Sequence, residues 1–137
     1  MSRVLWVDDE SKIELIQYKT PLIRGGYRVD IAADATEAVQ LLREEGYDSI
    51  ILDLVIPSGW NFETDTYYVG FELLKKLING KINGIGKHDP SCIIIFSAVN
   101  PCAEILKNIS ELGVETILNK RLCELDLLRN HVDRILK

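Results

Sequence analysis

The chain has 137 residues, of which 47% are hydrophobic and 27% charged, and its formal net charge is −5. This length suits one domain, residues 1–137, with a single core and no output module. The 16 basic residues are dispersed among 21 acidic ones, which argues against direct binding of nucleic acid. No apolar run approaches the ~20 residues that span a bilayer, and no signal-peptide pattern begins the chain, so we expect a cytoplasmic protein without membrane insertion.

Short apolar runs alternate with helical patterns along the chain. The first run, residues 3–7, predicts a buried strand and ends in three acids, Asp8-Asp9-Glu10. A helical pattern then begins at Ser11 and contains Pro21, which should kink or divide the helix. An alternating run at 27–32 predicts a second strand, at an edge of the sheet.

The next helix and strand are marked by acidic residues. Asp34 and Glu37 have the spacing of a capping box, which predicts a helix from there to about Glu45. The stretch from Ser49 to Pro57, S-I-I-L-D-L-V-I-P, is apolar on both faces, as in a strand of a parallel sheet. Because an unpaired acid is costly inside such a strand, Asp53 should mark its carboxyl end.

A loop of unusual length follows this strand, from residue 57 to 69, before a helix predicted at 71–79. Two interpretations of the loop stay open: it packs over the end of the sheet, or it forms a docking surface for another protein. The loop is rich in aromatic residues: Trp60, Phe62, Tyr67 and Tyr68.

A fourth apolar run, residues 92–96, ends at Ser97. Asn100 and Pro101 have the preferences of an N-cap and first helical residue, which predicts a helix from there through Leu112. A fifth strand is expected at 114–119, ending at Lys120. A terminal helix to Lys137 should bury one apolar face, composed of Leu122, Leu125, Leu128, Val132 and Ile135.

This order, a strand followed by a helix five times, predicts an α/β fold with a doubly wound parallel sheet and helices on both faces. In such sheets, ligands bind at the carboxyl ends of the strands. Five polar residues should therefore gather at one edge: Asp8, Asp9, Asp53, Ser97 and Lys120.

These residue types suit phosphoryl transfer. Asp8, Asp9 and Asp53 would repel one another without a cation, and oxygen ligands of this kind favour Mg²⁺. Lys120 and Ser97 could stabilise the oxygens of a transferring phosphoryl group. Asp53 is then the nucleophile, which forms an aspartyl phosphate.

The chain resembles the receiver domains of two-component response regulators. The resemblance covers nearly the whole sequence. Each motif alone is a weak signal, but their occurrence in order at the ends of the predicted strands is specific. They are Val7-Asp8-Asp9-Glu10, Leu52-Asp53-Leu54 with Pro57, Ser97-Ala98, Gly113 and Lys120, with Gly26-Tyr27 and Gly70-Phe71-Glu72-Leu73-Leu74 in support.

The resemblance implies a flavodoxin-like strand order of 2-1-3-4-5. It also implies that Asp53 accepts a phosphoryl group from a histidine kinase or phosphotransfer protein, and that Ser97 and Lys120 then move toward it. Asp8, Asp9, Asp53 and the backbone carbonyl of Val55 would hold Mg²⁺. The signal would pass to a downstream protein that the sequence does not name.

The sequence departs from the family pattern in several places. The glycine expected shortly after Pro57 is displaced to Gly70, so the loop contains an insertion. Ile117 stands where the family usually has an aromatic switch residue, and Arg121 stands where a proline is expected after the lysine. In the family, the residues at two further positions flank the path of the water that attacks the phosphorylated aspartate. Here these residues are Val55 and Val99, and apolar side chains disfavour that water. We therefore expect the phosphorylated form to decay slowly.

Three functions are therefore compared. The leading one is a phosphorylatable signalling module that is not itself an enzyme. Ile117, Arg121 and the insertion favour an alternative, a receiver-like binding module that works without phosphorylation. A Mg²⁺-dependent phosphatase or transferase is the third, and the absence of an Asp-x-Asp pair after the first strand argues against it.

Overall fold

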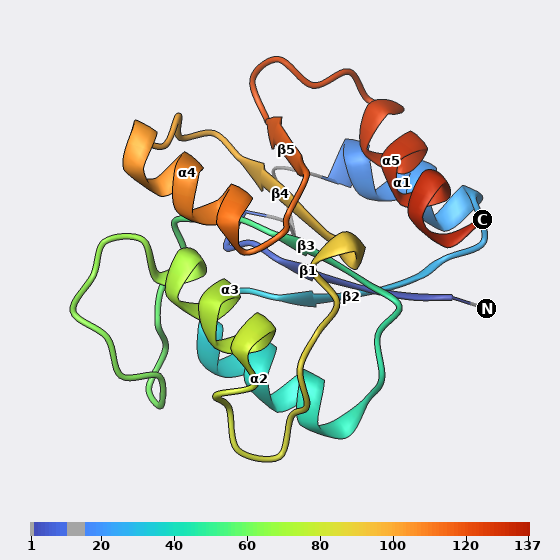
Figure 1. The fold of residues 1–137 in the computed structure, drawn as a ribbon. Helices are drawn as coiled ribbons and strands as arrows, with labels where there is room; N and C mark the ends of the chain where they lie inside the picture. Colours follow the sequence, from blue (N-terminus) through green and yellow to red (C-terminus); the bar gives the residue numbers. More distant parts are fainter. Residues whose placement is uncertain (1, 11–15) are drawn as a thin grey trace.

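The computed structural model describes residues 2–10 and 16–137, and it confirms a five-stranded parallel sheet in the order β2-β1-β3-β4-β5 (Figure 1). The predicted helix start at Ser11 lies outside the described residues. The strands are β1 (Arg3–Val7), β2 (Arg28–Ala32), β3 (Ser49–Leu52), β4 (Ile93–Ser97) and β5 (Thr116–Asn119). The helices are α1 (Ile16–Arg24), α2 (Ala35–Glu44), α3 (Val69–Asn79), α4 (Ala103–Glu111) and α5 (Leu127–Leu136), with a short 3₁₀ helix, η1 (Pro90–Cys92), before β4.

Helices cover both faces of the sheet, so the central strands are apolar on both sides. Helices α2, α3 and α4 pack on one face, and α1 and α5 on the other (Figure 1). Strand β1 shows the alternation: Leu5 and Val7 join the first core, whereas Val4 and Trp6 join the second. This arrangement explains why β1, β3 and β4 have continuous apolar sequences.

The start of α2 follows the predicted capping pattern. The backbone N–H of Glu37 donates to Oδ1 of Asp34 at 2.7 Å. The Glu37 carboxylate accepts at 3.4 Å from the backbone N–H of Ala33, one residue before the cap. The side chain of Asp34 thus satisfies a backbone donor that the first turn of the helix leaves without a partner.

The predicted start of α4 is wrong by two residues. The helix begins at Ala103, with Cys102 as the N-cap, and Cys102 makes no side-chain capping bond. Asn100 is engaged elsewhere, because its Oδ1 accepts a hydrogen bond of 2.8 Å from Nδ2 of Asn119 on β5. A contact between distant segments has overridden the local capping preference.

The terminal helix also begins later than predicted, at Leu127. Residues 120–122 and 125–126 form turns, and Leu122 and Leu125 are 82% and 48% exposed rather than buried. The N–H of Leu122 bonds the carbonyl of Asn119 at 3.1 Å, which closes a turn directly after β5. Lys120 and Cys123 are the buried residues of this segment.

Part of the inserted loop packs against the protein, and part of it is exposed to solvent. Phe62 and Tyr68 pack against the core beneath α2 and α3, whereas Trp60 and Tyr67 are 79% and 67% exposed. The hydroxyl of Thr36 on α2 ties the loop down, since it donates to the Ser58 carbonyl at 2.8 Å and accepts from the N–H of Asn61 at 3.0 Å.

Two further sequence features concern cysteines and membranes. Cys92 is half-buried, Cys102 exposed and Cys123 buried, and all three are unpaired thiols.

In the part of the chain that the structure describes, no helix combines the length and apolar character needed to cross a bilayer.

Candidate functional site

The register of the parallel strands brings the predicted residues together at one edge of the sheet. Val7 of β1 pairs with Leu52 of β3, so Asp8 and Asp53, the next residue of each strand, lie side by side. The N–H of Asp53 bonds the Val7 carbonyl at 3.0 Å. On the other side, the N–H of Lys120 bonds the Ser97 carbonyl at 3.0 Å, which places these two residues beside each other.

Lys120 is the centre of this charged cluster. Its Nζ lies 2.6 Å from Oδ2 of Asp8 and 2.8 Å from Oδ2 of Asp53. Lys120 is 8% exposed, Asp8 0% and Asp53 6%, so the ion pairs are largely shielded from solvent. Glu10 approaches the same amine at 3.6 Å from the exposed side. The lysine thus links the ends of β1, β3 and β5.

The second carboxylate oxygen of Asp53 is also held. The hydroxyl of Ser97 donates to Oδ1 at 2.7 Å, and the backbone N–H of Val55 donates to the same oxygen at 3.2 Å. With Lys120 on Oδ2, both oxygens of the carboxylate are bound and its orientation is fixed.

The start of α3 closes against the back of Asp53. A Cβ added to Gly70 would lie 1.9 Å from the carbonyl oxygen of Asp53 and 2.8 Å from Cα of Leu54. The N–H of Gly70 bonds the Leu54 carbonyl at 2.9 Å. Only glycine permits this approach, so the displaced glycine lets α3 reach the site despite the insertion.

Burial and ion pairing have opposite effects on the ionisable groups. Desolvation raises the pKa of Asp8 to about 6, although its hydrogen bond to Lys120 acts in the opposite direction. Burial alone would lower the pKa of Lys120, but its hydrogen bonds to Asp53 and Asp8 outweigh this effect and raise it above the ordinary value. The lysine is therefore charged at neutral pH.

The carboxylates form a donor set that fits a hard divalent cation. One oxygen from each of Asp8, Asp9 and Asp53 lies within 4.8 Å of the others. Asp8 and Asp53 are buried, whereas Asp9 is exposed and leaves one side open to solvent. Three carboxylates and one lysine leave a formal charge of −2 when all are ionised, which a divalent ion would balance.

Sequence reasoning missed two contacts of this site. Glu10 was assigned no role, although it reaches Lys120. Tyr18 on α1 was also missed, and its hydroxyl lies near the backbone of Lys120, 102 positions further along the chain. No short-range pattern indicates a contact over such a separation.

A doubly wound sheet with three aspartates, a hydroxyl and a lysine at its carboxyl edge defines the receiver class of signalling domains. The sequence matches the response regulator receiver domain family over residues 4–133, and the chain belongs to this family.

Solved structures of receiver domains are similar to this chain over almost its whole length. The receiver domain of the Francisella response regulator 1452 is 28% identical, with a TM-score of 0.71, and the match covers 98% of this chain and 96% of that one. A CheY-like receiver domain protein from Methanospirillum hungatei is 26% identical, with a TM-score of 0.69 and coverage of 98% and 94%. No curated protein sequence matches the chain.

Proposed function

We propose that the protein is a phosphorylatable module of two-component signalling and that Asp53 accepts the phosphoryl group. The arrangement around the Asp53 carboxylate supports this proposal: Lys120 and Ser97 bind its two oxygens, and Asp8 and Asp9 lie beside it. These are the groups that a phosphoryl transfer to a carboxylate requires.

In the proposed reaction, a carboxylate oxygen of Asp53 attacks the phosphorus of a phosphohistidine. The new P–O bond forms as the P–N bond breaks, and the electron pair leaves on the histidine nitrogen, which takes up a proton from solvent. Lys120 and Ser97 already contact the attacking carboxylate of Asp53 and would donate hydrogen bonds to the phosphoryl oxygens. No chemical conversion of a metabolite is involved, so the protein acts as a signalling module rather than as an enzyme.

Asp8, Asp9, Asp53 and the backbone carbonyl of Val55 would hold Mg²⁺ in this proposal. The ion would supply positive charge that neutralises the phosphoryl oxygens as the bond forms. The role of the Val55 carbonyl follows from the family resemblance. The carboxylate donor set and its uncompensated charge support the role of the three aspartates.

The phosphoryl donor is proposed to be a histidine kinase or a phosphotransfer protein, and the output a downstream protein target. Membership of the receiver family supports the first of these partners. Among the similar structures, the Francisella protein is described as a response regulator.

A phosphorylation assay tests the proposal directly. The protein would be incubated with a small acyl phosphate and Mg²⁺, and base-labile, acid-stable phosphate on the protein would be measured. We expect about one phosphate per chain on the wild type and none on Asp53→Asn, because an amide is not a nucleophile here. Removing Mg²⁺ with a chelator should reduce incorporation by at least about 100-fold.

Asp126→Asn is a matched control, because Asp126 is exposed and its side chain makes no capping bond. This variant should be phosphorylated like the wild type. No incorporation into the wild type would instead support a binding module that works without phosphorylation. Repeated turnover of the donor, rather than one phosphate per chain, would support a phosphatase.

The lifetime of the phosphorylated form is a second test. Val55 and Val99 are both half-buried beside Asp53 and Ser97, and the N–H of Val99 lies 3.4 Å from the Ser97 hydroxyl. Apolar groups here disfavour an attacking water, so decay should be slow and should accelerate about tenfold in Val99→Asn. Rapid decay of the wild type would contradict this expectation.

A further inference from the structure

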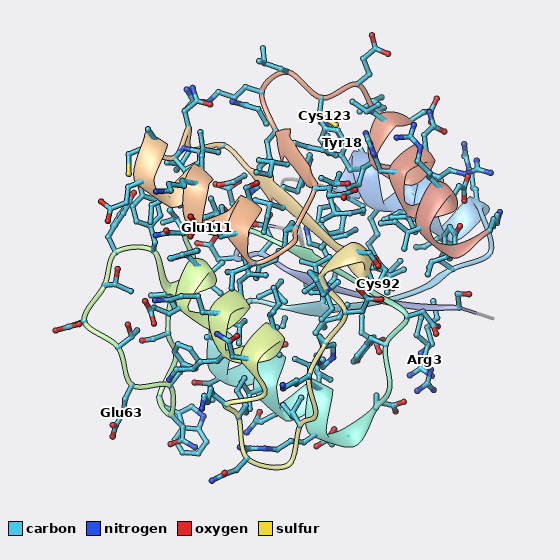
Figure 2. The ribbon with its side chains drawn as sticks, viewed as in Figure 1. Arg3, Tyr18, Glu63, Cys92, Glu111 and Cys123 are labelled. Atoms are coloured by element: carbon cyan, nitrogen blue, oxygen red, sulfur yellow. The ribbon has the colours of Figure 1, made fainter. Side chains whose placement is uncertain are left out.

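Tyr18 contacts the segment that follows Lys120. Its side chain is 7% exposed, and Figure 2 shows it beside Cys123, in the connection between β5 and α5. The hydroxyl lies 3.1 Å from the carbonyl oxygen of Cys123 and 3.4 Å from that of Lys120. A phenol has one proton to donate, so the two carbonyls share it and Cys123 is the nearer acceptor.

These two carbonyls lie at the two ends of the turn at 120–123, in which the N–H of Leu122 also bonds the Asn119 carbonyl at 3.1 Å. Arg121 occupies the position where the family resemblance predicts a proline, and it is exposed. The backbone N–H of Lys120 donates to the carbonyl of Ser97 on β4. The backbone N–H of Arg121 donates to the side chain of Asn119 at the end of β5. Tyr18 adds a restraint from α1, which acts on the carbonyl groups of the same turn.

The ring of Tyr18 also supports the neighbouring part of the site. It packs edge-to-face against Phe96, with the ring centroids 5.4 Å apart. Phe96 directly precedes Ser97, and the Lys120 amine lies 5.9 Å from the centre of the Phe96 ring. Tyr18 therefore contacts Phe96, the neighbour of Ser97, and the backbone of Lys120. It contacts none of the reacting atoms.

We propose that Tyr18 is a positioning residue for Lys120. Its hydroxyl holds the turn at 120–123 so that the amine stays within reach of Asp8 and Asp53, where the proline of the family pattern is absent. The effect on phosphorylation rests on the proposed function. The effect on the backbone of the turn does not rest on it, so the effect on the backbone and the effect on phosphorylation can be tested separately.

Tyr18→Phe removes the hydroxyl and keeps the ring against Phe96. Tyr27→Phe is a matched control, because Tyr27 is 5% exposed in the same core and its hydroxyl bonds Asp133 on α5 instead. Relative to exchange at Asp53, we expect amide hydrogen exchange at Lys120 to accelerate about tenfold in Tyr18→Phe and to change less than about twofold in Tyr27→Phe. The amide of Asp53, bonded to the Val7 carbonyl, reports any general loss of stability and therefore serves as the internal reference.

The rate of phosphorylation by a saturating acyl phosphate should fall about fivefold in Tyr18→Phe, with little change in the donor concentration at half-maximal rate. In a Lys120→Ala background, the same substitution should cause no further loss, because the group that it positions is gone. These results distinguish positioning of Lys120 from a general contribution to folding.

Unchanged exchange at Lys120 in Tyr18→Phe would overturn the inference, and so would equal effects of the two tyrosine substitutions. A wild type that accepts no phosphate, with the exchange result as expected, would refute the proposed function and leave the structural role of Tyr18 supported.

Discussion

Helices α3 and α4 lie on the same face of the sheet but are anchored to very different degrees. α3 buries six residues in the core, and its first turn meets the backbone of Asp53 at Gly70. α4 buries only Ile109, and Leu106 on the same helix is 40% exposed. A helix with few buried apolar contacts opens at a lower free energy than its neighbours.

A cavity of about 310 Å³ accompanies the weak packing of α4. Leu106 and Pro101 line it from the α4 side, and Ile117 lines it from β5, where the family resemblance predicts an aromatic residue. Ser97 also borders the cavity. The edge of the sheet that carries Asp53 and Ser97 thus meets a firmly packed helix on one side and a weakly packed helix on the other, so displacing α4 should cost less free energy than displacing α3.

The strongest test of the tight side is Gly70→Ala. The added methyl group would meet backbone atoms that cannot move without displacing β3 or α3, so we expect a loss of about 4 kcal/mol or more in unfolding free energy. Urea denaturation measures this loss. Gly46→Ala is the control, since an added Cβ there meets nothing within 4 Å, and it should change stability by less than about 1 kcal/mol.

The two helices should also differ when one leucine is shortened in each. Leu74 of α3 is fully buried, so Leu74→Ala should cost about 3 kcal/mol through lost burial and the cavity left behind. Leu106→Ala on α4 should cost about 0.5 kcal/mol, because the side chain is already partly in water. Similar losses in the two variants, measured by urea denaturation, would contradict the contrast in anchoring.

Amide hydrogen exchange compares the helices without a substitution. We expect the central amides of α4 to exchange at least about 30-fold faster than those of α3, which corresponds to a difference of ~2 kcal/mol in opening free energy. Equal protection of the two helices would show that α4 is held by contacts other than its buried face.

A smaller effect than those of Gly70→Ala and Leu74→Ala is expected on the opposite face, between Tyr27 and Asp133. Burial and the hydrogen bond to Asp133 raise the pKa of Tyr27 to about 12, and the same hydrogen bond lowers the pKa of Asp133. A lowered carboxyl pKa contributes stability above its ordinary value near 4, and this contribution is lost as the pH falls through the lowered value. A raised tyrosine pKa adds a loss of stability above about pH 10.

Tyr27→Phe should therefore cost about 1 kcal/mol at neutral pH, and the cost should shrink below about pH 4. Urea denaturation of both proteins across this range measures the difference. A cost that does not depend on pH would mean that the ionised form of Asp133 contributes nothing to the contact.

The sequence by itself determined the fold class, the strand ends and the residues that gather at them. Continuous apolar runs that stop at Asp8, Asp53 and Ser97 suffice for this, because a buried strand excludes an unpaired polar group and parallel strands end at a common edge. The start of α2 was also predictable, since the Asp34 cap depends on residues three positions apart.

Only the tertiary structure decided features that depend on contacts between distant segments. Asn100 bonds Asn119 instead of capping α4, and the turn at 120–123 displaces Leu122 and Leu125 from the core. The hydroxyl of Tyr18 meets the carbonyl of a residue 105 positions away, and no local periodicity encodes that meeting. Local patterns predict elements because their interactions span a few residues, whereas the anchoring of α3, the looseness of α4 and the support of Lys120 arise when the sheet brings remote segments together.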